Sequence, residues 1–251
     1  MWPARKRFVH TVLFQTWRDI RERPWATENR DRLTAIKEVA RAVGRRYGRH
    51  YNLIAFPGGW FGCNDIADLM RTLEADIAHS ILRRRKRMYI AFGVDSWPPF
   101  REMAIVMNCS GVVAVAPPCS SEEDRAFVFG GRVACVLACN EPGAMEGAGV
   151  DADSPFDLAL VLVHGFWPTG QLSGSGRYSL SLEGLARRLG CPVFAPAGFF
   201  MNRNIGKWRA GIAPEREGLI FRETVITEVP AFDGGIAAGT LGAGAILTFE
   251  L

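Results

Sequence analysis

Apolar and polar residues follow one another along the first hundred positions in blocks that predict strands and helices in turn. Short apolar runs at residues 8–14, 53–56 and 88–94 predict three strands. Between these runs, apolar residues recur at helical spacing, which predicts two helices. The first helix has the apolar face Leu33, Ile36, Ala40, Val43 and Tyr47 and ends at Gly48; the second is capped by Asn64 and has the apolar face Ile66, Leu69, Met70, Leu73, Ile77 and Ile81. This order predicts a sheet with crossover helices.

The rest of the chain adds hairpins and further buried strands. Residues 104–108 and 112–116, joined at Ser110 and Gly111, predict a pair of antiparallel strands. Leu182, Leu185, Ala186 and Leu189 mark a helix that Gly190 ends. Further strands are predicted at residues 158–163, 192–197, 219–229 and 245–251, with a Gly-rich surface loop at 234–244. No internal repeat or linker interrupts this order, so we expect one α/β domain over residues 1–251.

Composition agrees with one sizeable domain. The chain has 251 residues, 48% of them hydrophobic, and a mean hydropathy of +0.04, which suits a packed core and not a membrane protein. The basic N-terminus is followed by a segment with polar residues and no small-residue cleavage site, so we expect no secretory signal. The cysteines lack CxxC spacing and lie in or beside apolar runs, which predicts a reducing, cytoplasmic setting and no disulfide scaffold.

The net charge of +4 is concentrated in two basic runs, at residues 41–49 and 83–87. Each run lies where a predicted helix ends, and cations there complement the helix dipole. The alternative is a nucleic-acid patch, but no aromatic residues interleave with the arginines. We therefore expect solvated helix ends and neither a nucleic-acid nor a membrane partner.

The stretch from Gly131 to Glu141 carries the chemistry most clearly. An apolar run rich in β-branched residues ends abruptly on Cys139, followed by Asn140 and Glu141. Such a run predicts a strand buried on both faces. The carboxyl ends of strands are where α/β proteins place their reacting groups. Cys139 is therefore a candidate nucleophile.

This stretch resembles the nucleophile motif of the nitrilase, or carbon–nitrogen hydrolase, superfamily, in which a Gly-initiated apolar strand delivers the attacking cysteine. Four further segments match in order: 8–15, ending on Gln15; 54–57, before the family's catalytic Glu; 89–93, ending on Gly93; and 245–251, closing on an acid and Leu. The resemblance covers nearly the whole chain. It implies the family's four-layer αββα sandwich and a homo-oligomer.

The resemblance also implies a reaction mechanism, and two of the catalytic groups that this mechanism needs are missing from the sequence. The family uses a Glu base to activate Cys and a Lys to stabilise the tetrahedral intermediate. The Glu should follow Phe56-Pro57, where Gly58 stands, and no lysine occurs from Phe100 to Met201; Cys119 lies near the expected position. We therefore expect a pseudoenzyme with a binding, regulatory or assembly role, either with a small amide-like ligand or as a purely structural oligomer.

A divergent Cys-dependent hydrolase or acyltransferase acting on an amide-like C–N bond is the alternative. His164 ends the strand predicted beside the Cys139 strand and is its candidate base, oriented by Glu141 or Asp157. His164 is otherwise a polar residue at a strand end. Asp65 and Glu141 are the acids nearest in sequence to replace the missing Glu.

The other candidate binding residues also have alternative interpretations. Trp60, Phe61 and Trp167 either line a pocket or belong to the core. Cys119 and Cys139 form a conceivable redox or metal pair, but two ligands are too few for a closed zinc site, so no metal or cofactor is expected. The candidate binding residues are Gly58, Trp60, Cys119, Asn140, Glu141 and Trp167.

Overall fold

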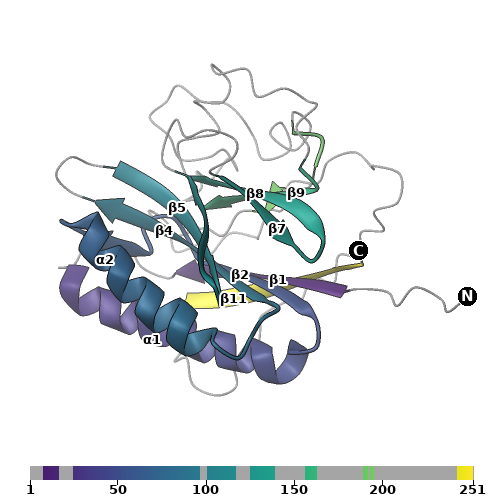
Figure 1. Ribbon diagram of the computed structural model, residues 1–251, viewed down its shortest axis with the longest axis horizontal. Coiled ribbons are helices and arrows are strands. Elements are labelled where there is room, and N and C mark those ends of the chain that lie inside the picture. The colour runs from purple at the N-terminus through teal and green to yellow at the C-terminus, as the bar shows by residue number, and fades with distance from the viewer. Residues whose placement is uncertain are drawn as a thin grey trace, which may run out of the picture.

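The computed structural model describes residues 8–16, 25–96, 101–116, 125–138, 156–162, 189–191, 193–194 and 242–250. Two sheets lie face to face, and helices cover the outer face of the larger sheet (Figure 1). No described helix is long and apolar enough to cross a membrane.

The larger sheet has the strand order β11-β1-β2-β4-β5-β6, with β3 beside β4. Neighbours among β1, β2 and β4 are parallel, as crossover helices require, whereas β5 and β6 form an antiparallel hairpin. The strands are β1 (Phe8–Thr16), β2 (Tyr51–Ala55), β3 (Phe61–Cys63), β4 (Met88–Ser96), β5 (Arg101–Asn108), β6 (Gly111–Ala116) and β11 (Gly242–Glu250). The strands predicted here are confirmed, although β11 begins inside the predicted Gly-rich loop.

The smaller sheet has the strand order β10-β9-β8-β7. Its strands are β7 (Ala126–Phe129), β8 (Arg132–Ala138), β9 (Leu158–Leu162) and β10 (Val193–Phe194). The parallel pairing of β8 with β9 confirms the predicted neighbours. Strand β7 was not predicted. Its residues alternate, because Phe127 and Phe129 are buried and Val128 between them is 64% exposed, and the turn that follows has positive φ angles of 64° at Gly130 and 90° at Gly131.

The helices confirm the predicted periodicity with two corrections. Helix α1 (Trp25–Tyr47) ends before Gly48 as predicted. Helix α2 (Ile66–Leu73) is capped by Asp65, not Asn64, because the Asp65 carboxylate accepts a hydrogen bond from the Asp68 amide at 3.0 Å. The predicted second helix then continues as a π-helix, η1 (Glu74–Ile81), whose last turn has a hydrogen bond from Leu82 N to Ile77 O.

Alternation along the strands divides the core into two layers. Phe92 and Val94 of β4 face the helices, whereas Ala91 faces the second sheet. Seven of the fifteen buried residues in the layer between the sheets are alanine, which lets the two sheets approach closely at these positions. Its alanines are Ala55, Ala91, Ala104, Ala114, Ala116, Ala134 and Ala138. Gly190 has a φ of 60°, whereas residues 182–188 of the helix predicted before it lie outside the described residues. The strand predicted at 219–229 lies outside the described residues.

Candidate active site

The carboxyl ends of β2, β4, β8 and β9 lie at one edge of the sandwich. The ring centroid of Phe129 is 6.1 Å from that of Tyr51, which begins β2, and 5.2 Å from that of Tyr89, near the start of β4. Phe129 pairs with Arg132, which begins β8. The amino ends of strands from both sheets therefore meet. Because packed sheets keep their strand directions nearly aligned, the carboxyl ends meet at the opposite edge.

Most of the predicted site residues follow strands at this edge. Strand β8 ends at Ala138, one residue before Cys139, and Ala138 pairs with Leu162, two residues before His164. Cys139 and His164 thus follow neighbouring parallel strands, as predicted. The side chains of Cys119, Cys139, Asn140, Glu141, His164 and Trp167 lie outside the described residues.

Gly58 lies in a backbone turn that packs against Gly93. Phe56 N donates to Ala91 O at 2.8 Å, and Gly93 N donates to Pro57 O at 3.0 Å, so pairing with β4 continues past the end of β2. A Cβ on Gly93 would lie 2.4 Å from Gly58 Cα and 2.6 Å from Gly59 N. The turn therefore occupies the space that any side chain at position 93 would need.

Helix α1 fixes the same turn from the other side. The buried Arg32 donates through Nη1 to Trp60 O at 2.6 Å, and Asn29 exchanges two hydrogen bonds with the backbone of Gly62. Trp60 is fully buried, and its ring centroid lies 4.7 Å from that of Phe56 in the helix-facing core. Trp60 and Phe61 thus belong to the core, which was the alternative to lining a pocket.

Replacing Gly93 by Ala should destabilise the fold. The added Cβ collides with backbone, which has to shift, so we expect a loss of about 1–3 kcal/mol or more in the free energy of unfolding. Urea unfolding measures it. Gly44→Ala is the matched control, because its Cβ would meet only flexible side chains, Arg85 at 3.2 Å and Met88 at 3.7 Å, and alanine favours the helix interior. Equal stability of the two variants would contradict the close contact at Gly93.

Two buried carboxylates that were not predicted lie at the same edge. Asp95 and Glu102 are directly opposite in the antiparallel pairing of β4 with β5, and they are 5% and 8% exposed. By alternation they share the faces of Ala91 and Ala104, which point toward the second sheet. Opposite residues of such a pair have Cβ atoms about 4.5–5.5 Å apart. Only the register of β4 with β5 brings these acids together.

The described part of the chain also contains a buried cation. Arg125, directly before β7, is 4% exposed. Carboxylates can accept hydrogen bonds from an amide NH2 or hold a proton, and a guanidinium can bind a carbonyl oxygen or an anion. Within the described residues, no group of three or more His, Cys, Asp or Glu side chains is placed to hold a metal ion.

Cys63 lies beside this edge but is not activated. In β3, Cys63 pairs with Ser96, and the preceding Gly62 pairs with Asp95. Burial raises the pKa of the Cys63 thiol to about 11, and the negative charges of Asp65 and Asp95 add to the shift. Cys63 therefore stays a thiol at neutral pH and is a poor nucleophile.

The pH dependence of alkylation should report this environment. At pH 8, iodoacetamide should modify Cys63 slowly, and the rate should rise toward pH 11 as the thiolate forms. Asp95→Asn should move the profile to lower pH, whereas Asp68→Asn, which removes an exposed carboxylate, should leave it unchanged. Peptide mapping by mass spectrometry gives the rates. A Cys63 profile centred near pH 8 would contradict the structure.

Comparison with solved structures identifies the fold. No protein-family model and no curated protein matches the sequence. Nit3 from Saccharomyces cerevisiae, of the nitrilase superfamily, aligns with a TM-score of 0.55 at 10% identity, over 81% of this chain and 80% of that chain. A mutant of the amidase from Nesterenkonia AN1, of the same superfamily, aligns with a TM-score of 0.54 at 15% identity, over 98% and 90%.

A larger protein contains a similar unit. The glutamine-dependent NAD+ synthetase from Acinetobacter baumannii aligns with a TM-score of 0.51 at 16% identity, over 75% of this chain but only 38% of that chain. At such identities the likeness establishes the fold alone. The chain has the α/β fold of the nitrilase superfamily, an αββα sandwich, which confirms the predicted fold class.

Proposed function

We propose that this protein is a catalytically degenerate relative of the carbon–nitrogen hydrolases, which binds a small amide-like ligand at the carboxyl edge without hydrolysing it. One observation carries the proposal: the turn after β2 supplies no acid or base. Pro57, Gly58 and Gly59 are buried there and packed against Gly93, and the apolar Trp60 and Phe61 follow. In the superfamily that the chain resembles, the general base follows this strand.

The energetic argument concerns both missing groups. Without a neighbouring base, a cysteine at neutral pH is mostly the unreactive thiol. Loss of one donor to the developing oxyanion costs roughly 2.7–4 kcal/mol of transition-state stabilisation, and no lysine occurs between Phe100 and Met201. Binding is less affected, because the buried carboxylates of Asp95 and Glu102 can still accept hydrogen bonds from an amide.

The intact protein should show no turnover of simple amides or nitriles above that of Cys139→Ala. Ammonia release measures turnover, and intact-protein mass spectrometry detects any acyl adduct. Cys63→Ser is the matched control, because it removes a cysteine whose raised pKa keeps it unreactive. Accumulation of an adduct on Cys139, with turnover lost in Cys139→Ala and kept in Cys63→Ser, would show that the protein is an active enzyme.

The second candidate is a divergent thiol hydrolase or acyltransferase. The observation that favours it is the buried pair Asp95 and Glu102, which lies at the edge where β8 leads into Cys139. In such an enzyme the thiolate attacks the amide carbon, a proton passes to the departing amine, and water or another nucleophile releases the acyl group. The base would be one of these carboxylates or His164.

Alkylation of Cys139 against pH separates the two candidates. A degenerate protein should give the profile of an ordinary free thiol in the wild type, Asp95→Asn, Glu102→Gln and His164→Ala alike. An active thiol enzyme should give fast alkylation well below that range, and the variant that lacks the base should restore the ordinary profile. Asp68→Asn, an exposed carboxylate variant, controls for the loss of one negative charge.

A further inference from the structure

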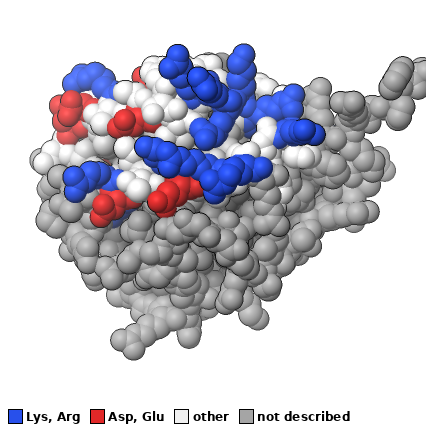
Figure 2. Space-filling view, turned by 90° about the horizontal axis from the view of Figure 1, so that it is seen from below, with Lys and Arg blue, Asp and Glu red and all other residues white. Residues whose placement is uncertain are grey.

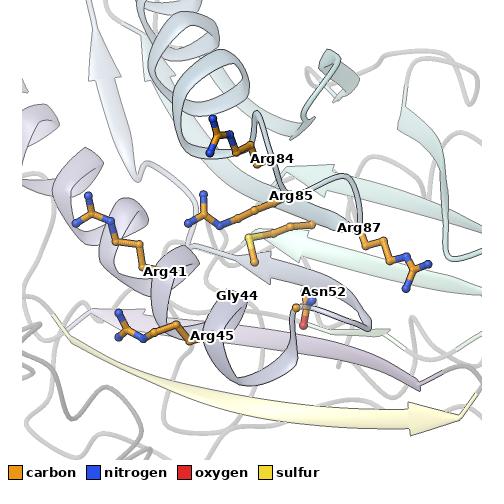
Figure 3. A pocket seen from close by; sticks show the side chains of 9 residues that line it. Arg41, Gly44, Arg45, Asn52, Arg84, Arg85 and Arg87 are labelled. Atoms are coloured by element: carbon orange, nitrogen blue, oxygen red, sulfur yellow. The ribbon is translucent and has the colours of Figure 1, made fainter.

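The fold brings the two basic runs of the sequence together around one pocket. Helix α1 ends shortly before β2 begins, and η1 ends shortly before β4 begins. The pocket formed there therefore lies at the amino edge of the sheet, opposite the candidate active site. Its volume is about 500 Å³. The side chains that define it are Arg41, Arg45, Asn52, Arg84, Arg85 and Arg87 (Figure 3). We call this site the arginine pocket.

Asn52 ties together the segments that form the pocket. Its backbone N–H donates to Arg87 O at 2.8 Å, and its buried side-chain Nδ2 donates to Tyr47 O at 3.0 Å and His50 O at 2.9 Å. Arg87 Nη1 in turn donates to Arg49 O at 2.6 Å. Hydrogen bonds therefore connect Asn52 to both the end of α1 and the start of β4, and they hold the walls of the pocket in place.

The arginines divide into two groups by what they contact. Arg85 donates to the carbonyl of Ile81, the last residue of η1, and Arg87 donates to the carbonyl of Arg49 in the turn between α1 and β2. Arg41, Arg45 and Arg84 are exposed, and their guanidinium groups make no hydrogen bond or ion pair with the described residues. Contacts with the backbone thus account for Arg85 and Arg87 and leave Arg41, Arg45 and Arg84 without a partner among the described residues.

Positive charge accumulates in the lining of the pocket. No acidic side chain is among the described residues that line the pocket. Figure 2, seen from the side of α1, shows Lys and Arg side chains gathered over part of this face. Burial lowers the pKa of Arg85, and the positive charge of Arg41 lowers it further. Holding these cations together costs free energy that a bound anion would recover.

We propose that the arginine pocket binds a small anion that carries two or more phosphate groups. The planar guanidinium fork matches phosphate oxygens in pairs, and several forks around one cavity suit several phosphates. The volume is that of a small-molecule site. Nucleic acid fits less well, because no aromatic side chain that could stack with a base is among the described residues lining the pocket.

Calorimetric titration with inorganic tripolyphosphate at low ionic strength tests the site. The wild type should bind one equivalent saturably, and Arg41→Gln combined with Arg84→Gln should weaken binding at least about tenfold. Both arginines are exposed, so the variant should keep the wild-type unfolding temperature. The matched control is Arg30→Gln with Arg101→Gln, which removes the same charge from exposed positions outside the pocket and should change the affinity less than about threefold.

Further probes identify the source of the phosphates. Tight binding of a nucleoside triphosphate with the same arginine dependence supports a nucleotide, and tight binding of tripolyphosphate alone supports an inorganic polyphosphate. Absence of saturable tripolyphosphate binding, or equal weakening in the control variant, overturns the proposal. It is also overturned if citrate or a single-stranded oligonucleotide binds more tightly than any of the phosphates through Arg41 and Arg84.

Discussion

The close approach of the two sheets is the constraint on which the rest of the structure depends. Alanines make up nearly half of the buried residues in the layer between them, beside larger Leu, Val and Phe side chains, and β5 packs near β8 and β4 near β9. At the amino edge the aromatic rings of Tyr51, Tyr89 and Phe129 fill the space instead. This arrangement aligns the strands and brings the ends of β2, β4, β8 and β9 to one edge.

The two edges of the sandwich have opposite chemistry. The carboxyl edge places the buried acids Asp95 and Glu102 in the inter-sheet layer, near the end of the strand that leads into Cys139. The amino edge carries arginines from α1 and from the segment between η1 and β4. The parallel strands β1, β2 and β4 with their crossover helices produce this separation, because the helix ends and the starts of these strands fall on one side of the sheet and their carboxyl ends on the other.

The local pattern of apolar and polar residues predicted most of the helices and strands. The features that it missed depend on hydrogen bonds and pairings that form only in the folded chain. The apolar spacing of α1 and the unbroken runs of β4, β8 and β9 were sufficient to locate these elements. The cap at Asp65 was misassigned because Asn64 and Asp65 are both good caps, and only the bond to Asp68 N distinguishes them. The apolar residues of η1 follow the spacing of an ordinary α-helix, so the sequence pattern did not indicate its π-helical hydrogen bonds.

In the candidate active site, only the strands that lead into it were predictable from the sequence. The run ending at Ala138 pointed to Cys139, and the pairing of β8 with β9 agrees with the expectation that His164 follows a neighbouring strand. Asp95 and Glu102 gave no such signal, because each is a single acid at the end of an apolar run until antiparallel register places them face to face. The arginine pocket was likewise visible only as two separate basic runs until Asn52 joined them.

The pairing of β1 with β11 affects how the chain can fold during synthesis. Strand β1 lies between β2 and β11, and β11 comes from the far end of the described sequence. One row of backbone N–H and C=O groups on β1 therefore stays open until the ribosome has made residues 242–250. An open strand edge is a template for pairing with other chains. Nascent molecules of this protein are thus exposed to misassembly through β1 while more than two hundred further residues are made.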